Sequence, residues 1–373
     1  MFLALHEMRR AVVRYTFLVL AIGLLVFLIL FQQALQDGLI TSFVGGIRNQ
    51  SAPVLVYSVD AQRTLQGGVI PPPLEEKIRQ VDGVGSAALV GQSTFTVRIE
   101  GGDETDAAII GTDDQKLFRP TSLSSGRRPD TDGEAVGSDA DFAVGDEVQV
   151  IPAPSGDPVT VTVVGVATDV QLSVTPTLFT DLKTFDAAVQ AANPDATTVL
   201  PNAIALTPAE GVTNAALVTA VNKAAPDAEA LTRSDAADKS PGVAQVRQSF
   251  QVIFLLFGLV VPLVTGLFFL IITLQKSGSL TLLRAVGARS GVLVWSLLIQ
   301  VLIVIALGLA VGIALYYPLS QARVGGLSLR FNGQVVLVWS AILLVLGLIS
   351  ALASMRRVLQ IDPIEATTGG GVR

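Results

Sequence analysis

Four uncharged apolar blocks constrain this chain more than any other feature of its sequence. They are residues 15–35, 252–274, 292–317 and 335–353, and none of them contains Lys, Arg, Asp or Glu. Each is close to the roughly 20 residues that an α-helix needs to cross the hydrocarbon layer of a membrane. A helix in a soluble protein seldom stays uncharged on every face over this length, because one face usually meets water. The blocks therefore predict four transmembrane helices.

The first block follows Arg9, Arg10 and Arg14, as the apolar region of a signal peptide follows basic residues. Two features favour a retained helix over a cleaved signal. The block is longer than the apolar region of a signal peptide, and the sequence from Phe31 to Gln36 lacks a small-x-small cleavage pattern.

Basic residues gather beside the ends of these blocks in three segments, which is the pattern of cytoplasmic loops. The residues are Arg9, Arg10, Arg14, Lys276, Arg284, Arg289, Arg356, Arg357 and Arg373. When four helices are threaded through a membrane, all three segments fall on one side. We therefore expect a multi-pass protein with both termini in the cytoplasm.

The long segment between the first two blocks has the opposite charge. Residues 36–250 contain 28 acidic and 14 basic side chains, a net charge of −14, while the rest of the chain carries +8 of the total of −6. An acidic domain outside the cell is a poor partner for nucleic acid. The chain has no cysteine, which excludes iron–sulfur sites and a lipid-anchored cysteine, and about 215 residues suffice to fold without disulfides.

Strand-like and helix-like patterns alternate irregularly in this acidic segment, which predicts an α+β domain in two lobes. Strands are expected at 54–59, 94–99, 107–111, 147–151, 159–166 and 202–206, and helices after Pro71–Pro73, at 182–192 and at 214–225. Residues 122–140 are rich in Gly, Pro, Ser and Asp and are expected to form a surface loop. Residues 36–51 and 242–251 are expected to extend the neighbouring transmembrane helices outward as helical stalks.

The predicted fold class is thus a four-helix membrane protein with a large extracytoplasmic α+β domain inserted between the first and second helices. The expected segments are an amphipathic cytoplasmic N-terminal segment (1–14), the first helix (15–35), the domain with its stalks (36–251), the second helix (252–274), a cytoplasmic coupling loop (275–291), the third helix (292–317), an extracytoplasmic loop (318–334), the fourth helix (335–353) and a cytoplasmic tail (354–373). An ordinary positive flank explains residues 1–14 equally well.

Small residues repeat at helical spacing in the last two blocks, where they allow helix backbones to approach closely. The candidates for helix packing are Gly308, Gly312, Gly347 and Ala351. The alternative is the ordinary use of glycine in membrane helices. Pro262 is expected to kink the second helix.

The sequence contains no recognisable catalytic constellation. Its one histidine, His6, lies on the N-terminal flank, and no G-x-x-x-x-G-K-[ST] phosphate loop occurs. Neither Asp103–Asp106 nor Asp113–Asp114 has the ligand spacing of a calcium loop. No ionisable residue lies deep in a predicted span, although ion-coupled carriers usually place one there. We expect no enzyme activity, no bound metal and no bound cofactor, and an external source of energy.

A few polar and aromatic residues in the spans are candidates for a substrate or dimer interface. Gln32 and Gln36 share a helix face by their i, i+4 spacing, with Gln33 beside them and Gln300 in the third span. Phe254, Phe257 and Pro262 belong to the second span. Hydrogen bonding between helices explains the glutamines more simply, and lipid-facing packing explains the aromatic residues equally well.

The inner loop includes Leu283-Arg284-Ala285-Val286-Gly287-Ala288, and the tail includes Arg356-Arg357 followed by Asp362-Pro363-Ile364-Glu365-Ala366. Earlier in the chain, the predicted outer domain contains four further motifs, at residues 126–129, 133–136, 144–148 and 163–166. In this order, the motifs resemble FtsX-like, MacB-type ABC transporter permeases over the whole chain. Unlike MacB itself, the chain has no fused ATPase, and its compact length and DPIEA ending are more similar to the DevC and HrtB type.

The resemblance implies that two permeases pair through their first two helices and that separate ATPase subunits, which bind ATP and Mg²⁺, dock on the inner loop. By position, the contact would involve Leu280, Leu283, Arg284, Ala285 and Gly287. Leu280, Leu283 and Val286 also recur at helical spacing and would offer an apolar ridge to a groove. The alternative is that this ridge lies on the membrane.

The resemblance further implies a bacterial cytoplasmic (inner) membrane protein, a permease subunit that exports or extracts a hydrophobic or amphiphilic substrate, often by mechanotransmission. Its partners would be the ABC ATPase, a second permease in a homo- or heterodimer, the lipid bilayer, and an adaptor or extracytoplasmic protein. The alternative function is a non-transporting, FtsX-type regulator that relays ATPase motion to an extracytoplasmic partner. Haem is a poorer candidate for the cargo, because His6, Met1, Met8 and Met355 all fall on the cytoplasmic side.

Overall fold

The computed structural model describes residues 11–196, 198–285, 290–321, 323–324, 327–329 and 331–359. These residues form two compact units. The helical unit consists of the described residues up to Asp37 and from Ser249 onward, and the sheet domain consists of Gly38–Gln248.

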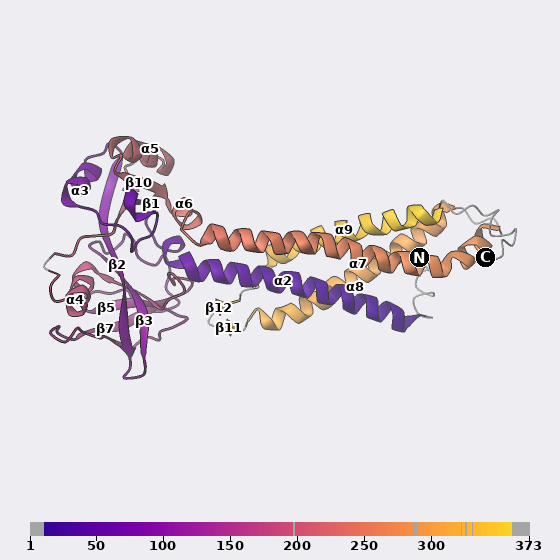
Figure 1. Cartoon of the computed structure of the whole chain (residues 1–373), viewed down its shortest axis with the longest axis horizontal. Coiled ribbons are helices and arrows are strands. Elements are labelled where there is room, and N and C mark those ends of the chain that lie inside the picture. The colour runs from indigo at the N-terminus through magenta and orange to yellow at the C-terminus, as the bar shows by residue number, and fades with distance from the viewer. Residues whose placement is uncertain are drawn as a thin grey trace. The chain divides into compact units, whose positions relative to one another are not determined.

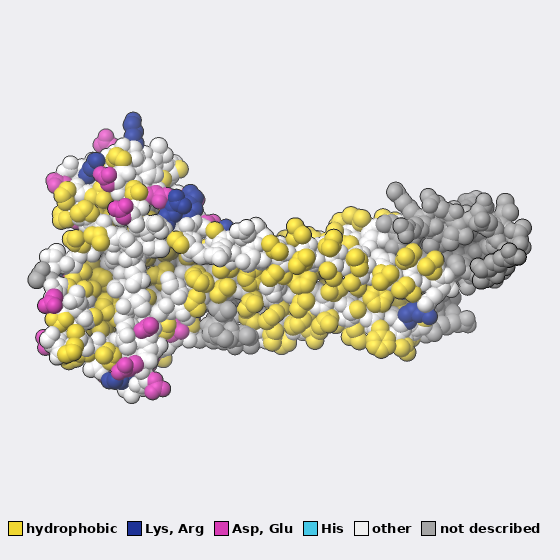
Figure 2. All heavy atoms as spheres, viewed as in Figure 1, with side chains coloured by type: hydrophobic (Ala, Val, Ile, Leu, Met, Phe, Trp, Pro, Cys, Tyr) yellow, Lys and Arg dark blue, Asp and Glu magenta, His cyan; other side chains and the backbone are white. Residues whose placement is uncertain are grey.

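Four long helices build the helical unit, and two of them also continue into the sheet domain. They are α2 (Val12–Arg48), α7 (Val243–Ala285), α8 (Ser290–Leu319) and α9 (Gly333–Leu359), and they run alongside one another in Figure 1. Each contains a window long and apolar enough to cross a membrane, and Figure 2 shows the hydrophobic side chains that cover the visible face of the bundle. A short ribbon of β11 (Arg323–Val324) and β12 (Leu327–Ser328) lies between α8 and α9.

The helices α2 and α7 are longer than the apolar blocks that predict them. The helix α2 continues past Leu35 to Arg48, and α7 begins at Val243 and continues through Pro262 to Ala285. Residues 275–285 of the predicted coupling loop therefore form the last three turns of α7.

The first lobe of the sheet domain is an antiparallel sheet covered on one face by two helices. Its strands β1 (Val54–Ser58), β2 (Val84–Ile99), β9 (Ala203–Pro208) and β10 (Ala228–Thr232) lie in the order β10-β1-β9-β2. The helices α3 (Pro72–Arg79) and α5 (Asn214–Ala224) connect β1 to β2 and β9 to β10, which gives the ferredoxin-like β-α-β-β-α-β arrangement. Ile78 of α3, Leu217 of α5 and Ile204 of β9 are fully buried in one apolar core.

Local sequence explains where these two helices begin. Pro71 precedes α3, and Pro72 and Pro73 take its first two positions, where the missing N–H groups cost no hydrogen bond. The side chain of Thr213 caps α5 by accepting a hydrogen bond from the backbone N–H of Ala216. The connection from β1 to α3 begins with a short 3-10 turn, η1 (Val59–Ala61), and α6 (Arg233–Asp238) follows β10.

The second lobe is a closed ring of strand pairings. The long strand β2 continues into it and pairs with β3 (Glu104–Thr112) and β6 (Glu147–Val150), and the ring is completed by β7 (Val159–Ala167), β5 (Glu134–Ser138) and β8 (Thr177–Asp181) in the order β2-β3-β8-β5-β7-β6. The two-residue strand β4 (Ser125–Gly126) pairs with β7 outside the ring. Alternate side chains of these strands, among them Val97, Ile109, Val161 and Leu178, form the core of the lobe.

The helix α4 (Leu182–Ala192) packs on the second lobe through Phe185. The facing glycines Gly91 and Gly111 make room for its ring, because a Cβ atom on either residue would collide with Phe185. The side chain of Asp181 caps α4 by accepting a hydrogen bond from the N–H of Thr184 at 2.8 Å.

The predicted fold class is confirmed: four apolar helices accompany a two-lobed α+β domain inserted between the first and second of them. The helices expected after Pro71 and at 182–192 and 214–225 are present. The expectation that 122–140 is only a surface loop is wrong, because β5 occupies 134–138 and is buried between β7 and β8. Its small residues are the reason: Gly137 lies against the ring of Phe142, where a larger residue does not fit.

Candidate functional site

The predicted ATPase-contact segment lies at the C-terminal end of α7. Leu280, Leu283, Arg284 and Ala285 belong to its last turns, and Gly287 lies outside the described residues. The structure describes the helical backbone at these positions but not their side chains, so the apolar ridge expected from Leu280 and Leu283 stays a prediction. The segment is continuous with the apolar window of the same helix.

The glycines of α8 and α9 lie where helices of the bundle come close. A Cβ atom on Gly308 would be 2.5 Å from Cγ2 of Ile22, and one on Gly312 would be 2.6 Å from Cβ of Val26, so both glycines of α8 face α2. A Cβ atom on Gly347 would be 2.6 Å from Cδ1 of Ile305. Ala351 lies one turn beyond Gly347 in α9, and its side chain is not among those described.

Sequence reasoning missed the counterpart of these glycines on α2. A Cβ atom on Gly23 would be 2.8 Å from Cγ1 of Val311, which places Gly23 opposite α8. The signal in the sequence is a single glycine in the first apolar block, without the four-residue repeat that marks α8.

Two glutamines connect α2 to other helices of the bundle. The hydroxyl of Tyr15 donates a hydrogen bond to Oε1 of Gln300 at 2.8 Å, and the indole N–H of Trp339 donates one to Oε1 of Gln33 at 3.3 Å. The predicted candidates lie beside Gln33: Gln36 is buried and Gln32 is half-buried.

One aromatic candidate of α7, Phe254, contacts α9. The rings of Phe254 and Trp339 have centroids 5.0 Å apart, and Phe257 is half-buried against the same core. The carbonyl of Pro262 accepts a hydrogen bond from the hydroxyl of Ser350 at 2.5 Å. The structure therefore brings Phe254 and Pro262 together with α9.

A different face of α7 is left uncovered in the single chain. Its members are large apolar side chains that are at least half exposed: Val252, Leu255, Leu256, Leu259, Leu263 and Leu267. We call these residues the open face of α7. They recur every three to four residues, and Gly258 among them has no other atom within 4 Å of an added Cβ.

No group of three or more His, Cys, Asp and Glu side chains that could hold a metal ion occurs in the described part of the chain. The charged side chains of the sheet domain instead form ion pairs. Among them, Asp238 accepts hydrogen bonds from Arg48 at the end of α2, at 3.2 Å, and from Arg247 at the start of α7, at 3.0 Å. This carboxylate links the two helices where each lies in the sheet domain.

The end of α2 is held in the sheet domain by the loop between β7 and β8. The N–H groups of Ser173 and Val174 donate hydrogen bonds to the carbonyls of Phe43 and Ser42 at 2.9 and 2.8 Å, and the N–H of Gly46 donates one to the carbonyl of Gln171 at 2.9 Å. We call residues 42–48 together with 169–174 the stalk joint.

Glycine and backbone strain both occur at the stalk joint. A Cβ atom on Gly45 would collide with the carbonyl of Asp169, so the close approach requires glycine. Asp169, Ser173 and Val174 have φ values of 58°, 55° and 61°, which are costly for residues other than glycine and especially for the β-branched Val174. Such strain persists only where the surrounding structure imposes it.

Comparison with known proteins gives relatives among permeases, although no family model matches the chain. Two strains of Staphylococcus epidermidis have a protein named hemin transport system permease protein HrtB, 26% and 27% identical to this chain over 112 residues. The HrtB of Staphylococcus haemolyticus is 29% identical over 110 residues. Each alignment covers 30% of this chain and about a third of the relative, 32%, 32% and 31% respectively.

Solved structures give weaker likenesses. The periplasmic region of MacB from Actinobacillus actinomycetemcomitans aligns with 52% of this chain and 94% of its own, at 13% identity and a TM-score of 0.36. The extracellular domain of the ABC-type transporter YknZ from Gram-positive bacteria aligns with 48% of this chain and 98% of its own, at 11% identity and a TM-score of 0.33. Likenesses this weak do not define a shared function.

The sequence relatives are permeases, and the described helices have the length and composition of membrane spans. These two findings agree with the order of motifs along the chain. The chain therefore resembles the HrtB-like permeases, as its sequence motifs predict.

Proposed function

We propose that this chain is the permease subunit of an ABC transporter, in which a separate ATPase binds ATP and Mg²⁺ and this chain exports or extracts a hydrophobic or amphiphilic substrate. In this proposal the chain lies in a bacterial cytoplasmic membrane with both termini in the cytoplasm. An adaptor or another extracytoplasmic protein receives the substrate on the outer side of the membrane.

The observation that carries the proposal is the continuity of α7. One helix of 43 residues begins in the sheet domain at Val243, contains an apolar window of membrane length, and ends with the Leu283-Arg284-Ala285 segment that resembles the ATPase contact. A helix transmits axial and tilting displacement because every backbone hydrogen bond lies along its axis. ATPase closure at one end of α7 would thus move the sheet domain, which is mechanotransmission.

The open face of α7 supports pairing with a second permease. Its leucines are matched by exposed apolar residues of α2, namely Phe17, Leu20, Leu24 and Leu28. Both surfaces are suited to lipid or to helix packing. We propose that a second permease covers them in the assembled transporter, as a homodimer or a heterodimer.

The coupling role is tested by changing the end of α7. The full chain is purified together with its ATPase in lipid nanodiscs, and ATP hydrolysis is measured. We expect Leu283→Ala combined with Arg284→Glu to abolish the ATP hydrolysis that depends on the permease, because the change removes an apolar contact and reverses a charge at the docking segment. Insertion into the membrane should be unchanged.

The matched control for this variant is Arg356→Glu, which makes the same charge reversal in α9 outside the proposed contact. Unchanged hydrolysis in the Leu283→Ala, Arg284→Glu variant would refute the contact. If the protein that co-purifies with the chain lacks a phosphate-binding loop, the proposal of an ATPase partner fails as well.

Transport and regulation are distinguished by what accumulates in cells. Deleting the gene should raise the intracellular level of a substrate if the chain is an exporter, whereas a regulator of the FtsX type would alter an extracytoplasmic partner without accumulation. Hemin belongs in the substrate panel because the relatives are named for its transport, beside uncharged lipophilic dyes. A deletion strain that retains none of these compounds would favour the regulator.

A further inference from the structure

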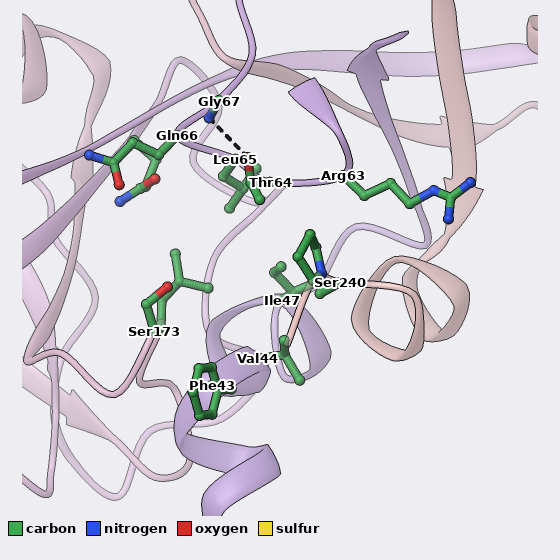
Figure 3. A pocket seen from close by; sticks show the side chains of 13 residues that line it. Phe43, Val44, Ile47, Arg63, Thr64, Leu65, Gln66, Gly67, Ser173 and Ser240 are labelled. Carbon is green, nitrogen blue, oxygen red and sulfur yellow. Dashed lines mark hydrogen bonds between the residues drawn. The ribbon is translucent and has the colours of Figure 1, made fainter. Parts of the chain in front are cut away.

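The sheet domain has a cavity of about 350 Å³ beside the stalk joint. Figure 3 shows its side chains, which come from the end of α2, the segment after η1, the strand β2, the β7–β8 loop and the residues that precede α7. The lining residues are Phe43, Val44, Ile47, Arg63, Thr64, Leu65, Gln66, Gly67, Gln92, Leu172, Ser173, Ser240 and Pro241. The volume is within the range of small-molecule sites in proteins.

One side of the cavity is apolar and offers a surface for a hydrophobic body. Phe43, Val44 and Ile47 lie in the last turns of α2 and are labelled together in Figure 3, and the buried Leu65 and Leu172 extend the same lining. Removing apolar surface from water on these residues would stabilise a bound ligand.

A buried amide supplies the polar contact. The side chain of Gln92 is 4% exposed and lines the cavity, yet its carboxamide makes no hydrogen bond with any described residue. The Gln92 amide is not among the described buried polar atoms that solvent fails to reach, so a ligand that displaces solvent from the cavity must replace the hydrogen bonds that water makes there. The Gln92 carboxamide offers two donors and one acceptor to a ligand.

The charge of the lining excludes an ionic ligand. Arg63 is the only ionisable residue among those that line the cavity. Its guanidinium is already paired with Glu229, with N···O distances of 2.8 to 3.0 Å, and in Figure 3 it extends away from the other labelled side chains. A charged ligand would therefore be desolvated without a counter-ion, which is costly.

We propose that this cavity binds a small uncharged amphiphile, whose apolar part lies on Phe43, Val44 and Leu172 and whose hydroxyl, carbonyl or amide group hydrogen-bonds to Gln92. The same ligand would contact the stalk joint and Ser240, three residues before α7 begins. Binding there stabilises this arrangement of the joint by linkage. The site does not depend on the proposed permease role.

The test is photolabelling of the full chain in lipid nanodiscs with three benzophenone probes of nearly equal size. They are 4-benzoylbenzyl alcohol, which is neutral, 4-benzoylbenzoate, which is an anion, and 4-benzoylbenzyltrimethylammonium, which is a cation. Peptide mass spectrometry separates labelling of the cavity segments 61–67, 171–174 and 240–241 from labelling of the helical unit by probe dissolved in lipid. We expect the alcohol to label the cavity segments at least fivefold more than either ion does.

Two variants and one control make the assignment specific. Gln92→Leu removes the hydrogen-bonding group at nearly constant volume and should reduce labelling by the alcohol about two- to tenfold, as loss of one hydrogen bond predicts. Gln66→Trp, at an exposed lining position, should block the cavity. Gln80→Trp, at an exposed position at the end of α3, is the matched control and should label as the unaltered protein does.

Thermal unfolding of each variant shows whether its fold is kept. The proposal is overturned if a folded Gln66→Trp variant still labels at 61–67 and 171–174, or if the anion labels these segments as strongly as the alcohol. Labelling confined to the helical unit would overturn it too, because the probe would then bind only in lipid.

Discussion

Glu134, the first residue of β5, accepts hydrogen bonds from the loop that precedes it. The guanidinium of Arg127 donates a hydrogen bond to its Oε2 at 2.7 Å, and the backbone N–H of Asp130 donates another at 2.9 Å. These contacts, that of Arg127 first, lower the pKa of Glu134 from 4.5 to about 2. They close the loop that leads into β5, a segment whose composition predicts a surface loop.

The pH dependence of unfolding should report this pair. Because the pKa of Glu134 is lower in the folded chain, its contribution to stability is complete above about pH 4.5 and is lost as the pH falls toward 2. In Arg127→Gln, the melting temperature of the sheet domain should therefore fall less steeply over this interval. The matched control is Arg98→Gln, which breaks the exposed pair with Glu104. An unchanged slope in Arg127→Gln would show that the pair is not formed.

Gly111 allows the ring of Phe185, and with it the helix α4, to pack closely on β3. In Gly111→Val, the added side chain collides with Phe185, and overpacking of this kind typically costs about 1–3 kcal/mol. We expect the melting temperature of the sheet domain to fall by about 2–12 °C. The combined variant Gly111→Val, Phe185→Ala should be less destabilised than the sum of the two single changes, because they share one contact. If the losses of stability in the two single variants add up to that of the double variant, Gly111 and Phe185 do not share a contact.

At the scale of elements, α2 and α8 are held together by small residues on both helices. Gly23 faces Val311, and Gly308 and Gly312 face Ile22 and Val26. Between membrane helices the hydrophobic effect contributes little, so close van der Waals packing decides which faces meet. The hydrogen bond between Tyr15 and Gln300 fixes the rotation of the same two helices.

Replacing one of these glycines should separate the helices. We expect Gly308→Leu to lower the thermal stability of the chain in detergent by about 1–3 kcal/mol, since its side chain would overlap Ile22. Gly258→Leu is the matched control in a helix of the same bundle, because Gly258 meets no other atom there. If both variants lose stability equally, the cost lies in glycine replacement itself and not in the α2–α8 contact.

For the molecule as a whole, two helices connect the units. The helices α2 and α7 each contribute residues to both the helical unit and the sheet domain. Inside the sheet domain, Asp238 accepts hydrogen bonds from Arg48 of α2 and Arg247 of α7. With side chains about 40–45% exposed, these pairs contribute little to stability, at most about 1 kcal/mol. We expect their effect to be that the two helices move together.

Breaking this link should separate ATP hydrolysis from transport in the proposed transporter. We expect Asp238→Asn to keep the melting temperature within a few degrees and to keep ATP hydrolysis, while substrate export falls several-fold. The control is Asp235→Asn in the same helix α6, whose carboxylate pairs only locally with Lys239. Equal export by both variants would show that the link does not carry motion.

The sequence by itself determined the features that depend on local pattern. Four uncharged blocks specify four apolar helices, because hydrocarbon tolerates neither charge nor unpaired backbone. The prolines 71–73 indicate where α3 begins, and helical spacing indicates α4, because both signals act within a few residues. The permease motifs, including Leu283 and Arg284, are also short runs of residues that can be recognised without the tertiary structure.

Only the tertiary structure decided which residues meet across long separations in the chain. The strand β5 has the composition of a loop and becomes a buried strand because β7 and β8 pair with it. Gln92, Gly45 and the open face of α7 have no distinguishing local pattern, and their roles depend on what packs beside them. The physical reason is that burial and strand pairing are set by neighbours distant in sequence, whereas hydropathy and helix capping are set by neighbours adjacent in it.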